Sequence, residues 1–444
     1  MKKKSLIVVL LLLCVTFAFA SCSKPIFNDG PSSNDQVIGN GGMAVIKGEY
    51  LYFTNAFSSQ EDVAVGGNKY DKEEPISAIY RTKLNNGSIS IDENGNPVGA
   101  EILVKQIGGF EQTNLYIVGD YLYYVTPKTL NDADKNTITG LLSFNRIKLD
   151  GSDHKEVYST NQTASEYSIA YSGTTAYIFI NINNNITLVT CDKKIKTSTF
   201  AEGVSDIILP SGELVSDFDK TVFYTKTVTI NDDGQVNGNK IMKKGLNDKD
   251  EQVALLNGQT FTLVANKNNR LYYTVDSILY SNNFNGKLTQ YGYNSYSNYA
   301  ILNDNNGVDK GVIATYSSSD YNSIVLLNDV DVSPIKLIVD GMTDSQTYSI
   351  ITATNNDVIY YVDNKVYKKN IYDNTSAISI GEFNLTVDSN TYIDCDGERL
   401  FYFAQVEESN KTYYYLHVVN LVEDAKGQFI GVLHQDDILD EEEK

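Results

Sequence analysis

The sequence predicts an all-β fold: a β-propeller of four-stranded antiparallel blades, with eight blades favoured and seven as the alternative. Three observations lead to this prediction. A strand-turn-strand unit recurs along the chain, the composition is rich in strand formers, and no convincing amphipathic helix of three turns or more is present outside the N-terminus. The 444 residues also exceed the usual limit of a single hydrophobic core, which favours two domains or a repeat array.

The recurring unit is clearest in residues 357–371. Residues 358–362 are β-branched or aromatic, Asp363 and Asn364 have the chemistry of a turn, and residues 365–371 begin with the alternation of a second strand. The 32 tyrosines and only 7 prolines of the whole chain suit such hairpins. The unit therefore predicts one hairpin of a repeated sheet.

Copies of the apolar strand 358–362 can be followed from one end of the chain to the other. Its counterparts are residues 50–54, 121–125, 176–180, 222–224, 270–273, 312–316 and 399–403. Successive copies begin about 40 to 70 residues apart, which is enough for four strands. Each such sheet buries a face only by stacking on the next, and a closed ring leaves no uncovered end. A count of seven blades remains the alternative, because the sixth copy matches the repeat pattern weakly and the first copy is unusually long.

The N-terminus has the features of an export signal. Lys2, Lys3 and Lys4 precede an apolar run, residues 5–18, that is too short and too one-sidedly flanked for a comfortable membrane span. The sequence Phe-Ala-Ser-Cys at 19–22 resembles the lipobox of bacterial lipoproteins, in which the cysteine receives diacylglycerol and becomes the mature N-terminus. The alternative is ordinary cleavage after Ala20, which leaves Cys22 as a free thiol.

These features divide the chain into four parts. We expect residues 1–21 to be a lipoprotein signal peptide and residues 22–40 a flexible tether after lipidated Cys22. Residues 41–433 form a single propeller domain, completed by a C-terminal strand at 428–433, and residues 434–444 form an acidic tail. The expected location is the extracytoplasmic face of the cell membrane.

The charge of the chain restricts its partners. Removing residues 1–21 takes away three lysines and no acidic residue, which leaves 33 basic residues against 56 acidic ones and a net charge of −23. Such a surface repels nucleic acid and anionic lipid headgroups. We therefore expect no nucleic-acid partner, and the diacylglycerol on Cys22 has to supply the membrane attachment.

The cysteines give little scope for disulfide bonds. Cys14 leaves with the signal and Cys22 is lipidated, so only Cys191 and Cys395 remain in the folded body. They lie five repeats apart. Two separate buried thiols are the expected arrangement.

One family resemblance follows from the repeat. The sequence Gly-Glu-Tyr-Leu-Tyr-Phe at 48–53, followed by Ile-Tyr-Arg at 79–81, resembles the low-density-lipoprotein-receptor-like β-propeller repeat. This domain of unknown function occurs in many lipoproteins and exported proteins of Gram-positive, AT-rich bacteria. The resemblance covers about residues 41–433 and implies a propeller outside the cytoplasm, with no catalytic motif to transfer.

The sequence contains no recognisable catalytic or cofactor motif. Its three histidines do not share a metal-ligand spacing, and no nucleophile elbow, phosphate loop or dinucleotide fingerprint occurs in a fitting context. Asp132, Asp134 and Asn136 have the first three spacings of a calcium loop, but Thr137 and Ser143 replace its glycine and glutamate. These three are weak calcium candidates, and we expect neither a catalytic residue nor a cofactor.

Tyrosines in one loop form the best candidate ligand site. Tyr291, Tyr293, Tyr296 and Tyr299 crowd a Gly, Asn and Ser-rich stretch between the fifth and sixth copies, where they could form a recognition surface. We therefore expect a binding or scaffolding module for a protein or glycan of the cell envelope, rather than an enzyme.

Two alternatives remain. A glycan-active enzyme would need carboxylates such as Asp120, Asp219 and Asp394 to converge in the central channel. An assembly factor for envelope proteins would show an exposed apolar patch or an open strand edge.

Overall fold

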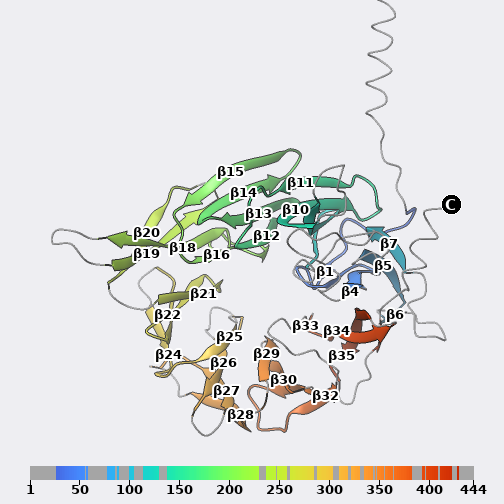
Figure 1. Cartoon of the computed structure of the whole chain (residues 1–444). Helices are drawn as coiled ribbons and strands as arrows, with labels where there is room; N and C mark the ends of the chain where they lie inside the picture. The colour runs from blue at the N-terminus through green and yellow to red at the C-terminus, as the bar shows by residue number, and fades with distance from the viewer. Residues whose placement is uncertain are drawn as a thin grey trace, which may run out of the picture.

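The computed structural model is built from β-strands (Figure 1). It describes residues 27–55, 57–58, 78–85, 88–89, 100–104, 114–129, 138–229, 237–246, 248–257, 261–284, 288–303, 310–318, 322–330, 335–343, 346, 348–354, 356–363, 365–382, 393–395, 397–408, 411–422 and 428–429. The strands in these ranges form eight sheets, each based on a four-stranded antiparallel meander. An all-β propeller of four-stranded blades is thereby confirmed, and the sheet count matches the eight blades that the sequence favours over seven.

Sheets 1 to 4 contain the first half of the chain. Sheet 1 comprises β1 (Val37–Ile38), β2 (Ala44–Lys47), β3 (Tyr50–Asn55), β5 (Ala78–Asn85), β6 (Ser88–Ile89) and β7 (Glu101–Val104). Sheet 2 comprises β8 (Tyr116–Val118), β9 (Tyr121–Thr129), β10 (Ile138–Lys148) and β11 (Lys155–Ser159). Sheet 3 comprises β12 (Glu166–Ser172), β13 (Thr175–Ile182), β14 (Asn185–Cys191) and β15 (Ile195–Glu202), with β17 (Gly212–Glu213) added in parallel to β12. Sheet 4 comprises β16 (Ile207–Ile208), β18 (Thr221–Thr229), β19 (Asn237–Gly245) and β20 (Glu251–Asn257).

Sheets 5 to 8 contain the second half. Sheet 5 comprises β21 (Phe261–Lys267), β22 (Arg270–Val275), β23 (Ile278–Asn282) and β24 (Leu288–Tyr291). Sheet 6 comprises β25 (Ser297–Ile301), β26 (Val312–Ser317), β27 (Asn322–Leu327) and β28 (Lys336–Met342). Sheet 7 comprises β29 (Tyr348–Ala353), β30 (Asp357–Val362), β31 (Lys365–Asn370) and β32 (Ile378–Glu382). Sheet 8 comprises β33 (Ile393–Cys395), β34 (Arg399–Glu408), β35 (Lys411–Asn420) and β36 (Gln428–Phe429), and β4 (Phe57–Ser58) also pairs with β35.

Each apolar strand expected from the sequence is the second strand of its sheet's meander, and successive residues of it pack on different neighbours. In β22, Tyr272 lies in the cluster shared with sheet 6, whereas Leu271 and Tyr273 lie in the cluster shared with sheet 4. Side chains alternate across a strand, so a fully buried strand requires a sheet on either side. Seven buried clusters join the eight sheets in chain order.

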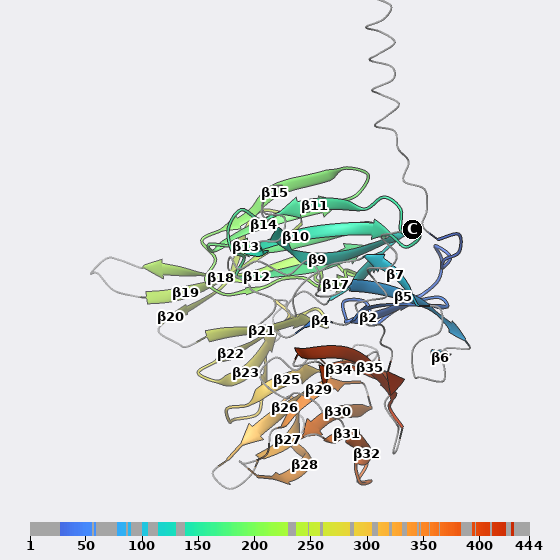
Figure 2. The same ribbon diagram turned by 45° about the vertical axis from the view of Figure 1, so that its right-hand side comes forward.

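The last and first sheets meet through backbone pairing. Tyr413 and Tyr414 of β35 pair with Ser58 and Phe57 of β4, a short strand that follows β3 in the chain. In both views the strands of sheet 8 lie beside those of sheet 1 (Figures 1 and 2). In β3, Phe53 is buried on the face opposite the one that packs on sheet 2. In β34, Phe401 is buried on the face opposite the one that packs on sheet 7. The sheets therefore follow one another in a closed circle.

Asparagine and aspartate make the tight hairpins possible. Asn183 and Asn184, and likewise Asn268 and Asn269, have φ between 50° and 62° in two-residue turns. Two consecutive positive φ values define the type I′ turn, whose twist matches paired strands. Asparagine tolerates this conformation better than other non-glycine residues. Both turns join neighbouring strands of one meander.

Lysines add polar links between sheets. The Lys47 ammonium donates to the carbonyl of Gly119 in sheet 2 at 2.6 Å, and Lys267 donates to the carbonyl of Ile301 in sheet 6 at 2.7 Å. Lys47 ends β2 and Lys267 ends β21, in each case the strand that precedes the apolar strand of the meander. Burial lowers the pKa of both ammonium groups. Each hydrogen bond ties the turn of one sheet to the backbone of the next.

The two cysteines of the body are free, as expected. Cys191 is buried in β14, where burial raises the pKa of its thiol to about 11. Cys395 lies in β33 and is only half-buried, which corrects the expectation of two buried thiols.

Replacing Phe223 should test the packing between sheets 4 and 5. Its ring is buried and lies 5.3 Å from the ring of Phe218 and 5.6 Å from that of Phe284, which follows β23. We expect Phe223→Ala to lower the free energy of unfolding by about 3–5 kcal/mol, because it leaves a cavity. Val215→Ala, at a side chain that is 78% exposed, should change it by less than about 0.5 kcal/mol. Denaturant titration checks both values, and equal losses would contradict the packing described.

Candidate functional site

The segment from Phe27 to Asn40 packs on the ring, which corrects the prediction of a flexible tether for these residues. Its β1 pairs antiparallel with β2, and the Phe27 amide donates to the Asp150 carbonyl of sheet 2. The Asn40 side chain exchanges two hydrogen bonds with the backbone of Ile117. We call residues 27–40 the N-terminal strap.

A buried arginine holds the strap. Arg81 in β5 is 1% exposed, and its guanidinium donates to the carbonyl and the Oδ1 atom of Asp29 at 2.9 and 2.7 Å. Two further hydrogen bonds, of 2.9 and 2.7 Å, reach Oε2 of Glu101 in β7. The guanidinium carbon lies 3.5 Å from the centre of the Phe27 ring. A buried arginine needs such partners, since an unpaired buried charge is strongly unfavourable.

Asp29 completes this network. The Tyr50 hydroxyl donates to its Oδ2 atom at 2.8 Å. Hydrogen bonds from Tyr50 and Arg81 lower the pKa of the Asp29 carboxyl below its ordinary value of 3.8. Burial and the hydrogen bond to Asp29 raise the pKa of Tyr50 to about 12. The network therefore consists of an ionised aspartate, a cation and a neutral tyrosine at physiological pH.

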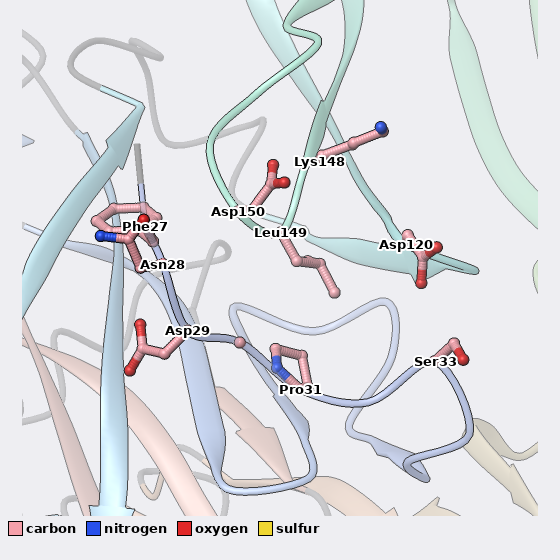
Figure 3. Close-up of a pocket in the computed structure, with 10 residues that line it drawn as sticks. Phe27, Asn28, Asp29, Pro31, Ser33, Asp120, Lys148, Leu149 and Asp150 are labelled. Carbon is pink, nitrogen blue, oxygen red and sulfur yellow. The ribbon is translucent and has the colours of Figure 1, made fainter. Parts of the chain in front are cut away.

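A pocket of about 540 Å³ lies between the strap and sheet 2 (Figure 3). Asp29 and Asp120 supply carboxylates at its wall, together with Lys148 at the end of β10 and the turn residues Leu149 and Asp150. Leu149 points from sheet 2 toward Pro31 of the strap (Figure 3). The volume is in the range of small-ligand sites, and the lining suits a hydroxyl-rich or cationic group. Several of its acids already have structural partners, because Asp150 Oδ1 accepts the Ser152 amide and Asp29 holds Arg81.

The four candidate tyrosines do not form one exposed surface. Tyr291 is fully buried, with its hydroxyl 3.1 Å from that of Ser281, and Tyr296 is buried with its ring 5.6 Å from Tyr316. The half-buried Tyr299 donates to the Tyr296 carbonyl at 2.6 Å. Only Tyr293 is exposed, at 67%. Tyr291 and Tyr296 therefore belong to the core, which corrects their assignment to a recognition surface.

The buried tyrosines fix the loop that carries Tyr293. Gly292 has φ of +72°, and a Cβ atom there would lie 2.8 Å from the Tyr296 ring. Glycine alone fits such a position easily. Tyr293 is thus an exposed aromatic side chain on a loop with two buried anchors.

The remaining candidate residues divide into two groups. Cys22, Asp132, Asp134 and Asn136 lie outside the described residues. Asp120, Asp219 and Asp394 belong to different sheets: Asp120 lies in the turn between β8 and β9, Asp219 precedes β18, and Asp394 is in β33. Asp219 Oδ2 accepts the Ser216 amide at 2.7 Å, which gives it a role in its turn. Within the described ranges, no group of three or more histidine, cysteine or acidic side chains is arranged to hold a metal ion.

The fold defines the protein as a β-propeller. No protein-family model matches the sequence, and a search of curated protein sequences found no match either. Among solved structures, the chain is similar to the β-propeller domain of the Trilobed protease from Pyrococcus furiosus. The identity is 11%, the TM-score is 0.41, and the match covers 80% of this chain and 98% of that one.

Two further structures have a similar likeness. The acylaminoacyl peptidase of Pyrococcus horikoshii is 12% identical with a TM-score of 0.43, and the match covers 75% of this chain but 54% of the peptidase. An oligogalacturonate lyase in complex with manganese is 9% identical with a TM-score of 0.36, over 86% of this chain and 95% of the lyase. At these values no activity is transferred to the present chain.

Replacing Arg81 should release the strap. We expect Arg81→Met to lower the free energy of unfolding by about 1–3 kcal/mol, because Asp29 and Glu101 lose their charged hydrogen-bond donor. Tyr50 in turn loses the ordered position of its acceptor, Asp29. Hydrogen exchange in residues 27–38 should accelerate. Lys83→Met is the matched control on the same strand, since Lys83 is exposed and its pair with Glu49 is worth less than about 1 kcal/mol. Unchanged strap protection in Arg81→Met would contradict the role of Arg81.

The strap should also respond to acid. Because the folded-state pKa of Asp29 is lowered, its stabilising effect is present above 3.8 and is lost as the pH falls through the folded pKa. Hydrogen exchange of the strap, corrected for the intrinsic rate, should therefore be the same at neutral pH and at pH about 5 and should rise below about 3.8. Asp29→Asn should weaken protection at neutral pH and remove its dependence on acid. An acid response that is identical in Asp29→Asn would show that other groups cause it.

Proposed function

We propose that the protein is a lipid-anchored propeller outside the cytoplasm that recognises a protein or glycan of the cell envelope. The lipobox-like sequence that ends at Cys22 supports the anchor, and the resemblance to propeller repeats of exported proteins supports the location. A closed ring of sheets supplies rigid support for loops, which is how many propellers present binding residues.

The exposed side chain of Tyr293 is the observation that carries the proposal. Tyrosine offers a large contact area with few rotatable bonds, so little conformational entropy is lost when it binds. The buried Tyr291 and Tyr296 reduce that loss further by fixing the loop. Tyr293 is therefore the residue on which recognition of a sugar ring or a protein strand would depend.

The recognition role predicts a specific effect of replacing Tyr293. The soluble body, residues 23–444, is tested against an array of envelope glycans and proteins, with product analysis for each ligand bound. For a ligand found in this way, Tyr293→Ala should reduce affinity about 30-fold, equivalent to about 2 kcal/mol, as expected for a binding hot spot. Tyr372→Ala, at an exposed tyrosine in sheet 7, should leave affinity unchanged.

Two results would overturn the proposal. Equal effects of the two tyrosine replacements would remove the role of Tyr293. Turnover of a bound glycan would favour the enzyme hypothesis instead, and would direct attention to the carboxylates Asp29, Asp120 and Asp150 of the pocket.

A further inference from the structure

Exposed apolar side chains are concentrated at one end of the strands. In a four-stranded meander, the turn between the first and second strands and the turn between the third and fourth lie at the same end. We call the face formed by these turns the turn face. Nine large apolar side chains are exposed among the described residues, and seven lie in or beside turns of this face: Val215, Leu288, Ile335, Leu337, Tyr372, Ile378 and Val422.

These seven residues extend over much of the ring. Val215 precedes β18 of sheet 4, Leu288 begins β24 of sheet 5, and Val422 follows β35 of sheet 8. The other four are in sheets 6 and 7. A contiguous exposed apolar patch indicates an interaction surface, whereas apolar side chains exposed singly do not. The four residues of sheets 6 and 7 are the densest part of this set, because the ammonium of Lys336, between Ile335 and Leu337, lies 6.0 Å from the centre of the Tyr372 ring. The other three extend the set to sheets 4, 5 and 8. Their wide distribution suits a broad, flat partner.

The N-terminal strap approaches the ring on the same face. The Gly48 amide, in the turn between β2 and β3 that begins the four-stranded meander of sheet 1, donates to the Gln36 carbonyl of the strap. Phe27 binds the backbone of Asp150, in the turn between β10 and β11. Cys22 and Phe27 are five positions apart, and five residue steps span at most about 18 Å. A lipid on Cys22 would therefore hold the turn face close to the membrane surface.

The polar groups of the turn face also suit an interfacial location. The ammonium groups of Lys310 and Lys336 lie 5.8 and 6.0 Å from the centre of the Tyr372 ring. Tyrosine and lysine are frequent at membrane interfaces, where an apolar body meets a polar tip. The mature net charge of −23 excludes strong attraction to anionic lipid, so the apolar side chains have to provide the contact.

We propose that the turn face of the propeller docks on the bilayer surface, with Val215, Leu288 and Val422 among the side chains at the headgroup boundary. This inference rests on the proposed lipid anchor and adds the partner and the orientation of the ring. Tyr293, in the connection between β24 and β25, belongs to the opposite end of the strands. Docking on the turn face leaves that end accessible to ligands.

The chain has no tryptophan, so a single introduced tryptophan reports on its own surroundings. Leu288→Trp and Val422→Trp place the probe on the turn face, and Tyr293→Trp is the control. Each full-length lipidated variant is inserted into phosphatidylcholine vesicles, with or without brominated acyl chains. We expect a blue shift and bromine quenching of emission at positions 288 and 422, and neither change at position 293. Quenching should persist in high salt, because the contact is apolar.

The same samples separate the anchor from the docking. Mass analysis of the N-terminus and flotation with vesicles report the anchor, and Cys22→Ser should abolish both signals. Flotation without quenching at 288 and 422 would overturn the docking and leave the anchor intact, as would equal quenching at all three positions. Absence of lipid on Cys22 would overturn the anchor and, with it, this orientation.

Discussion

Burial on both faces of one strand in each sheet is the constraint on which this structure depends. Leu122 and Tyr124 of β9 pack toward sheet 1, whereas Tyr123 between them packs toward sheet 3. The same division occurs in β30, where Val358 and Tyr360 face sheet 6 and Ile359 and Tyr361 face sheet 8. A strand with this pattern cannot lie at the end of a stack, because one of its faces would then be exposed to water. Closure of the ring satisfies the constraint for all sheets at once.

Polar residues attach the N-terminal strap to this apolar framework. Arg81 projects from sheet 1 and gathers Asp29, Glu101 and the Phe27 ring, so that a polar segment before the first repeat becomes part of the folded body. The side chains of Asp29 and Glu101 are 61% and 49% exposed, while Arg81 is buried beneath them. The strap itself therefore covers the charged guanidinium of Arg81 from water. This contact explains why few apolar residues are needed to hold the strap on the ring.

The sequence was sufficient for the strands and insufficient for the strap and the tyrosine loop. Core strands such as 358–362 are recognisable because β-branched and aromatic residues adjoin turn residues, and this information is local. The strap depends on contacts between residues about 50 positions apart, such as Asp29 with Arg81, and its local composition is that of a linker. The apolar pair Ile26 and Phe27 in an otherwise polar stretch is the available signal. Tyr291 and Tyr296 were misassigned for a related reason, since glycine and asparagine around them predict a surface loop although their rings fill a space between sheets 5 and 6.

The pairing of β4 with β35 has a consequence for the order in which the protein folds. It joins residues 57–58 to residues 413–414, so almost the entire chain lies between the two partners. A chain synthesised from its N-terminus can stack sheets 1 to 7 one after another, each on the sheet before it, but β4 has no partner until the last repeat has been made. Loop-closure entropy rises only slowly with length, so the delay affects the rate of folding far more than the final stability. Until that moment sheet 1 lacks its last neighbour, and the nascent ring is a curved stack with one aromatic face open to association with other chains.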